Sequence, residues 1–160
     1  MIKALLPVAA AALLATVAAC SNNQGKPSFY RSLASSSAQI DTTMAQNMIS
    51  AYRRNNGLGP LTLDPSLQAV ARQEASAMAG SDRPGSADII KQRLSQGSIP
   101  SAEVNTSAGY HTLAEAFSGW RDSPQHNRVM LAAGAKRMGI ATAYAPGSKY
   151  KVYWVLITAP

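Results

Sequence analysis

Residues 138–157 read MGIATAYAPGSKYKVYWVLI and contain the most informative pattern of this chain. The first half of this stretch alternates larger side chains with Gly or Ala from Met138 to Tyr144, and its second half alternates again from Tyr150 to Ile157. A period of two is typical of β-strands, and the Pro146-Gly147 step between the halves is typical of a turn. The stretch therefore predicts an antiparallel hairpin at the C-terminal end.

Upstream of the hairpin, capping signals predict a series of helices. Residues 41–43, 64–65, 112–115 and 123–124 place Asp, Thr or Ser directly before an apolar run at helical spacing. These side chains accept hydrogen bonds from the first helical amides, and proline is tolerated in the first turn. A weaker helix is expected at 88–96 and a short strand at 102–105. Helices first and strands last predict the α+β class.

Composition and charge restrict the function classes. The chain has 160 residues and a formal charge of +7, which suits one domain with short appendages. Its basic pairs, Arg53-Arg54 and Lys136-Arg137, are isolated and are expected on a solvated surface, so the clustered stripe that binds nucleic acid is missing. One cysteine excludes an intramolecular disulfide, and two histidines exclude an all-histidine zinc site within one chain.

The N-terminal segment, residues 1–19, is typical of an export signal. It carries one charge, Lys3, then a short apolar run and small residues up to Ala19. Because Cys20 follows directly, the segment resembles a bacterial lipobox, which implies acylation of Cys20 and anchoring in a membrane. Plain secretion with cleavage after Ala19 is the alternative. Residues 20–39 are rich in Ser, Asn and Gln and predict a flexible tether. Ser21 favours the outer membrane, facing the periplasm.

Five short motifs in a fixed order then give the chain a family resemblance. They lie at residues 52–61, 63–67, 102–105, 120–131 and 138–155, and include Ala102-Glu103-Val104-Asn105 and Ser123-Pro124-Gln125-His126. Together they resemble the bacterial form of the CAP superfamily (cysteine-rich secretory protein, antigen 5 and pathogenesis-related 1; SCP-like). The resemblance implies that residues 40–160 form an α-β-α sandwich, with a small antiparallel sheet between helical layers and a groove on one face.

The resemblance also implies where a functional site would lie. The family groove often carries two histidines and two acidic residues, which can hold a divalent metal. Glu103 and His126 match two of the four, whereas Arg137 stands in place of one histidine and residues 81–87 lack the other. Because guanidinium offers no lone pair to a metal, we expect no family-type metal site, no cofactor, and an ion pair between Glu103 and Arg137. His126 is expected either to fasten its helical turn or to serve the groove.

Two functions from different classes follow from these residues. The first is a cell-envelope lipoprotein whose domain binds a lipid, cell-wall or protein ligand through the Glu103, His126 and Arg137 groove without catalysis. The second is a periplasmic hydrolase in which Glu103 and His126 act as general base and acid. The sequence leaves the ligand, the oligomeric state and any residual activity open.

Overall fold

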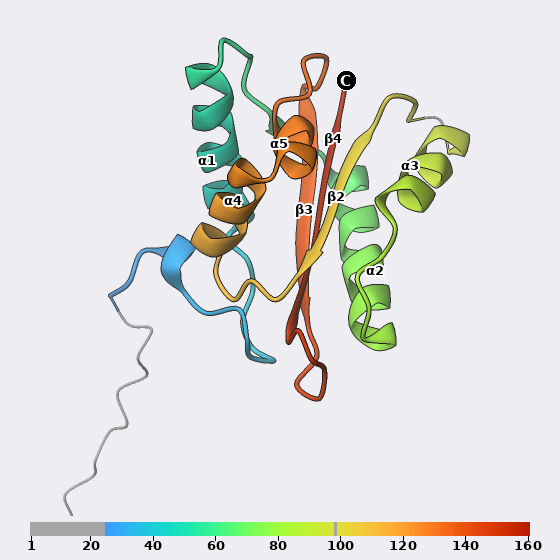
Figure 1. The fold of residues 1–160 in the computed structure, drawn as a ribbon. Helices are drawn as coiled ribbons and strands as arrows, with labels where there is room; N and C mark the ends of the chain where they lie inside the picture. Colours follow the sequence, from blue (N-terminus) through green and yellow to red (C-terminus); the bar gives the residue numbers. More distant parts are fainter. Residues whose placement is uncertain (1–24, 98) are drawn as a thin grey trace, which may run out of the picture.

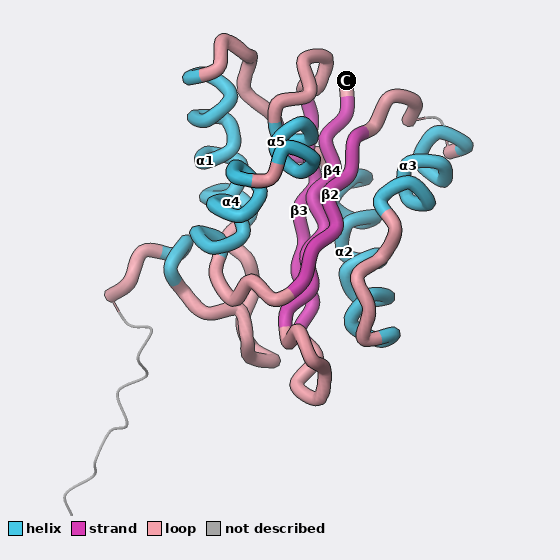
Figure 2. Tube along the Cα trace, in the orientation of Figure 1, coloured by secondary structure: helices cyan, strands magenta, loops and turns pink. Residues whose placement is uncertain are grey.

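The fold is a three-layer α+β sandwich, seen edge-on in Figure 1. The structure is a computed structural model that describes residues 25–97 and 99–160. Three helices cover one face of the sheet and two cover the other, as the resemblance implied (Figures 1 and 2). The first face carries α1 (Thr42–Asn55), α4 (Leu113–Asp122) and α5 (Pro124–Met130), and the second carries α2 (Pro65–Ser81) and α3 (Ala87–Gln96).

The sheet between the helical layers has four strands in the order β1-β3-β4-β2. The predicted hairpin is confirmed as β3 (Arg137–Tyr144) and β4 (Val152–Ala159), which pair antiparallel. The predicted short strand is β2 (Glu103–Ala108), which pairs antiparallel with β4 along the other side. The prediction of a purely antiparallel sheet is wrong, however, because the two-residue β1 (Thr62–Leu63) pairs parallel with the start of β3.

Most of the helix starts follow their capping residues. Asp41 Oδ1 accepts from the Met44 amide at 2.9 Å, and Asp64 Oδ1 accepts from two amides at the start of α2, both at 2.9 Å. Thr112 caps α4, although the Glu115 carboxylate reaches the His111 amide one residue before the cap. The short α5 begins after Ser123, whose side chain makes no capping hydrogen bond.

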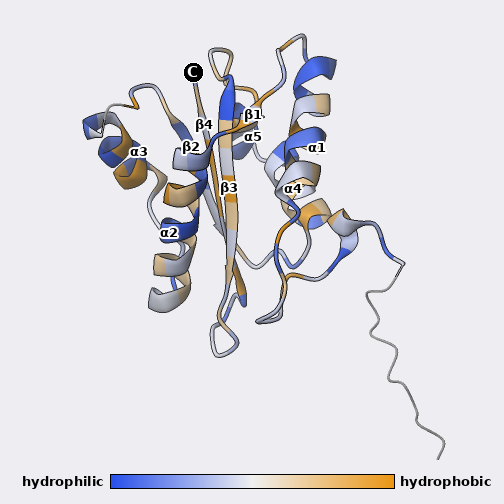
Figure 3. Cartoon of the chain, turned by 180° about the vertical axis from the view of Figure 1, so that it is seen from behind, coloured by the Kyte–Doolittle hydropathy of each residue, from blue (hydrophilic) through white to orange (hydrophobic). Residues whose placement is uncertain are grey.

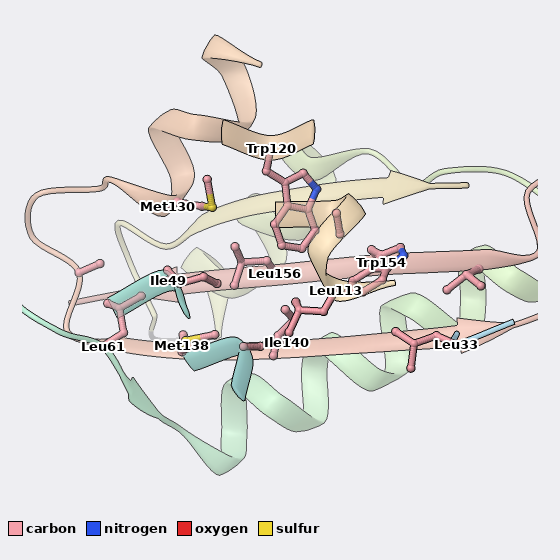
Figure 4. Packing of buried hydrophobic residues seen from close by; sticks show 14 residues of the cluster. Leu33, Ile49, Leu61, Leu113, Trp120, Met130, Met138, Ile140, Trp154 and Leu156 are labelled. Carbon is pink, nitrogen blue, oxygen red and sulfur yellow. The ribbon is translucent and has the colours of Figure 1, made fainter. Parts of the chain in front are cut away.

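Apolar side chains fill both interfaces between the sheet and the helices. On the side of α1, α4 and α5, Trp120 and Trp154 meet edge to face with ring centroids 5.7 Å apart (Figure 4). Both indole nitrogens find acceptors, Ser107 Oγ at 3.0 Å and the Tyr110 carbonyl at 2.8 Å. Every residue of β4 is buried, since this strand lies between β3 and β2 with helices on both faces.

Gly139 of β3 sets the distance between α2 and the sheet. A Cβ atom at this position would lie 2.3 Å from the backbone carbon of Leu67, so only glycine allows the helix to lie this close. The contact brings the next residue of α2, Gln68, against the outer edge of β3. Its side-chain amide donates to the Ile140 carbonyl, and its oxygen accepts from the Ile140 amide at 3.0 Å.

Arg53 does not lie on a solvated surface as predicted. Its side chain is fully buried at the end of α1, although Arg54 beside it is exposed. The guanidinium donates to four backbone carbonyls at 2.8–3.0 Å, which belong to Gly59, Met130, Ala132 and Ala135. Arg53 therefore ties the exit of α1 to the loop after α5, and burial lowers the pKa of its guanidinium.

The segment before α1 is only partly the spacer that the sequence predicts. A single helical turn at Ser28–Tyr30 is followed by Leu33, which is 6% exposed and belongs to the core beside α4. The Leu33 amide donates to the His111 carbonyl at 2.7 Å. The packed domain therefore begins before residue 40. The predicted signal at 1–19 and Cys20 lie outside the described residues. Among the residues that the structure describes, no helix is long and apolar enough to cross a bilayer.

Candidate functional site

The three candidate site residues lie on three different elements: Glu103 on β2, His126 on α5 and Arg137 on β3. His126 sits in the short α5, which Asn105 of β2 fastens to the sheet by donating from Nδ2 to the His126 carbonyl at 3.0 Å. The His126 Nδ1 atom is buried and has no hydrogen-bond partner among the described residues. Burial lowers the pKa of the imidazole, because a low-dielectric environment disfavours its charged form. His126 is therefore neutral at neutral pH.

Glu103 opens β2, the strand at one edge of the sheet. Its Oε2 atom lies 2.9 Å from the Lys91 Nζ of α3, and both side chains are about one third exposed, at 37%. The carboxylate also lines a surface hollow of about 270 Å³ with Arg128 and residues 132–135. Its negative charge is thus already compensated by a neighbouring ammonium group, with a second cation in the same hollow.

The predicted ion pair between Glu103 and Arg137 is wrong. Arg137 Nη1 lies 2.9 Å from Asp64 Oδ2 instead, and Arg137 Nε donates to the Pro160 carbonyl at 2.8 Å. The strand order explains the error, since β4 separates Arg137 on β3 from Glu103 on β2. Two strands with one strand between them lie roughly 9–10 Å apart across a sheet.

Asp64 has two tasks in this arrangement. Its Oδ1 caps α2, and its Oδ2 receives Arg137. The hydrogen bond from the Leu67 amide, followed by that from Arg137, holds the pKa of the Asp64 carboxyl below its usual range. Arg137 therefore belongs to the junction of β1, α2 and β3 and not to a groove with Glu103.

A metal ion does not fit the residues that match the family tetrad. Glu103 is paired with Lys91, Arg137 cannot be a ligand, and the Nδ1 atom of His126 is buried, so His126 would have to bind an ion through Nε2 without a second ligand from this set. Across residues 25–97 and 99–160, no three His, Cys, Asp or Glu side chains gather closely enough to hold a metal ion. The arrangement offers hydrogen bonds and charges at a surface, and no assembled acid–base pair.

Two structural features escaped the sequence reasoning. One is the buried Arg53, whose acceptors come from two distant segments of the chain. The other is the contact of Gln68 with the edge of β3, for which no motif exists. The single available signal was Gly139 within an alternating strand, because an isolated glycine there often marks a close approach of another backbone.

Comparisons with known proteins agree with this architecture. The profile of the CAP family, described as "Cysteine-rich secretory protein family", matches residues 46–158. A search of curated proteins found no match.

Solved structures show the same fold at low sequence identity. An outer surface protein of Borrelia burgdorferi is 18% identical with a TM-score of 0.64, over 76% of this chain and 96% of its own. A cysteine-rich secretory protein of Staphylococcus aureus is 18% identical with a TM-score of 0.60, over 73% of this chain and 37% of its own. An extracellular SCP-domain protein of Bacillus anthracis is 18% identical with a TM-score of 0.60, over 73% of this chain and 39% of its own. The family profile covers most of the domain, so this chain belongs to the CAP, or cysteine-rich secretory protein, family.

Proposed function

We propose that this chain is an exported lipoprotein whose CAP domain binds a lipid, cell-wall or protein ligand without catalysis. The state of the two candidate catalytic groups carries the proposal. The Glu103 carboxylate is paired with Lys91 at 2.9 Å, and the His126 Nδ1 atom is buried without a partner. Neither group accepts a hydrogen bond from the other.

General acid–base catalysis needs more than these two groups provide. A catalytic base must lie within hydrogen-bond reach of the proton that it removes, and a histidine base is normally oriented by a second polar group. The buried His126 Nδ1 has no such orienting partner among the described residues. The Glu103 carboxylate is already paired with the Lys91 ammonium group at 2.9 Å and would have to leave this partner to take a proton from a substrate. Binding through charge and hydrogen bonds makes no such demands.

Export and anchoring rest on the N-terminal segment and on the relatives. Residues 1–19 have the pattern of a signal, and Cys20 stands where a lipobox cysteine would receive its lipid. The three solved relatives are named as outer surface, secretory and extracellular proteins. Ser21, and not Asp, follows Cys20, which favours the outer membrane, facing the periplasm. Two or more acyl chains would give stable anchoring there.

Turnover and binding can be separated in one experiment. Purified full chain is incubated with cell-wall sacculi and, separately, with phosphatidylglycerol vesicles, and both co-sedimentation and release of soluble fragments are followed over time. The double variant Glu103→Gln/His126→Ala is compared with the control His111→Ala, which changes the other, exposed histidine. We expect co-sedimentation with at least one of the two materials, and no fragment release by any protein.

For the hydrolase alternative, the lowered pKa of His126 suits a general base and not the general acid that the sequence analysis assigned to it. If wild type and His111→Ala release fragments while the folded double variant does not, the alternative is correct and the binding proposal fails. Mass spectrometry of the mature N-terminus tests the anchor independently. We expect a peptide that begins at Cys20 and carries acyl chains, and none in Cys20→Ala. A free thiol in the exported wild type would contradict the lipoprotein assignment.

A further inference from the structure

The outer edge of β3 is only partly covered. The neighbouring β1 pairs with Arg137 and Met138 alone, so from Gly139 onward β3 is an edge strand on this side. Figure 3, which views the molecule from behind, shows β3 in front, with β1 crossing only its upper end. An edge strand presents unpaired N–H and C=O groups and is a template for pairing with another chain.

The hydrogen-bond pattern identifies which backbone groups point to this edge. In an antiparallel pair, alternate residues bond to one neighbour while the residues between them point the other way. The Ala145 amide donates to the Lys151 carbonyl of the hairpin at 2.8 Å, so the odd-numbered residues of β3 face β4. The even-numbered ones face the edge. Accordingly, the Met138 carbonyl accepts from the Asp64 amide at 2.9 Å, and Gln68 bonds to both backbone groups of Ile140.

The next two even-numbered residues, Thr142 and Tyr144, have no such cover. No described residue forms a hydrogen bond with their backbone N–H or C=O on the edge side. A hollow of about 380 Å³ lies beside Thr142, between α2 and the segment 38–42, and its lining includes Gln68, Arg72 and Ile40. The segment 38–42 forms the outer wall of this hollow without bonding to β3 through its backbone.

Charge and polarity differ between the two walls of the hollow. On the α2 side, Arg72 is exposed and takes part in none of the ion pairs among the described residues. On the opposite side, Ala38 and Ile40 offer apolar surface. A strand laid along β3 would point alternate side chains to these two walls.

We propose that this edge binds an extended, acidic peptide segment of a partner protein by β-strand addition. The partner backbone bonds to Thr142 and Tyr144, an acidic side chain meets Arg72, and the apolar side chains on either side of it face Ala38 and Ile40. About five residues span this length of strand. The inference rests on the proposed function only in treating the domain as a binding module, and it names the class of partner.

A second copy of this chain fits the edge less well. Two β3 edges paired antiparallel around Thr142 would bring two Arg72 side chains to the same interface, in a chain whose formal charge is already +7. Like charges across such an interface disfavour association. An acidic segment instead supplies the counter-charge that Arg72 lacks among the described residues.

The probe for this proposal is a fluorescein-labelled peptide, Thr-Val-Glu-Val-Thr, with Thr-Val-Lys-Val-Thr as its charge-reversed partner. Binding to the purified full chain in detergent is measured by fluorescence anisotropy, and hydrogen–deuterium exchange of residues 138–145 locates it. We expect the glutamate peptide to bind at least fivefold more tightly than the lysine peptide. It should slow exchange of the Thr142 and Tyr144 amides, whose N–H groups have no hydrogen-bond partner on this edge among the described residues.

Two variants test the backbone and the charge separately. Thr142→Pro removes an edge-facing N–H and leaves the bonds between β3 and β4 intact, since these belong to the odd-numbered residues. It should weaken binding about fivefold, as for one lost hydrogen bond. Arg72→Glu should reverse the preference between the two peptides. Arg83→Glu, an exposed arginine beyond α2 with the same change in net charge, should not. Urea unfolding midpoints confirm that each variant is folded.

Each contrary result overturns the proposal. Absence of binding by both peptides at millimolar concentration would do so, as would exchange protection confined to residues outside 138–145. Slower exchange at this edge that depends on protein concentration without peptide would assign it to a second copy. An equal effect of Arg72→Glu and Arg83→Glu would show that only net charge acts. If the peptides do not bind, the strand-addition proposal fails and the co-sedimentation result is unaffected. If fragments are released from cell walls, the proposed non-catalytic function fails and the peptide result is unaffected.

Discussion

Replacing Arg53 with methionine tests whether one buried side chain holds two distant segments together. The guanidinium donates to carbonyls of Gly59, Met130, Ala132 and Ala135 at 2.8–3.0 Å. Methionine keeps a similar apolar stem and removes every donor. The variant Arg53→Met therefore isolates the hydrogen bonds from the packing.

The cost of this change can be worked from the four acceptors. Met130 and Ala135 are buried, so their carbonyls have no water to replace the lost donor, whereas Gly59 is exposed. A buried acceptor left unsatisfied costs ~1–3 kcal/mol. Removing a buried charge offsets part of this, since burial already lowers the pKa of Arg53 and so disfavours its charged form. We expect a loss of about 3 kcal/mol in the free energy of unfolding.

Urea unfolding followed by tryptophan fluorescence measures this loss. Trp120 and Trp154 are both fully buried and report on the core. With a denaturant slope of about 2 kcal/mol per molar, the midpoint should fall by about 1.5 M. Arg54→Met is the matched control: that neighbour is exposed, and its replacement should change stability by less than about 0.5 kcal/mol. Equal midpoints for the two variants would refute the tie between α1 and the loop after α5.

Three further predictions concern other parts of the domain. Gly139→Ala should lower the free energy of unfolding by about 1–3 kcal/mol, because its Cβ would meet Leu67 at 2.3 Å; Gly80→Ala, with free space around it, should not lower it in the same urea titration. Burial holds the pKa of His126 below the ordinary value of a histidine, so the unfolded chain binds that proton more tightly. Stability should therefore be level above about pH 6.5 and fall as the pH drops below it, and a His126→Gln variant with the same slope in this range would contradict the assignment. Calorimetric titration with zinc should show no sub-micromolar binding, and such binding lost in Glu103→Gln would restore the metal site that the pairing with Lys91 argues against.

The helices and the hairpin could be predicted because their causes are local. Asp41, Asp64 and Thr112 each cap a helix that begins at the next residue, so the signal for each helix start lies in adjacent residues of the sequence. The β3–β4 hairpin likewise follows from two alternating runs and one turn. Even at this scale the prediction had a gap, since β1 pairs over only two residues and is too short to show any period.

The site could not be predicted in the same way because its geometry depends on strand order. Nothing in the local sequence says that β4 runs between β3 and β2, and this order sends Arg137 to Asp64 and leaves Glu103 to Lys91. Arg53 escaped for a related reason. Its acceptors lie 6 to 82 residues away along the chain, and an Arg-Arg pair gives no sign that one member is buried.

The short β1 links the fold to the open edge. Asp64 directly follows this strand and caps α2, so the chain must leave the sheet at that point. Because Gly139 lets α2 lie close to β3, the side chain of Gln68 can satisfy Ile140. One helical turn later the same face of α2 carries Arg72, which reaches the hollow but has no hydrogen bond to β3 among the described residues. Because Asp64 turns the chain into α2, β1 stops there and leaves the rest of β3 without a neighbouring strand. A longer β1 would pair with more of β3, but Asp64 could then not cap α2.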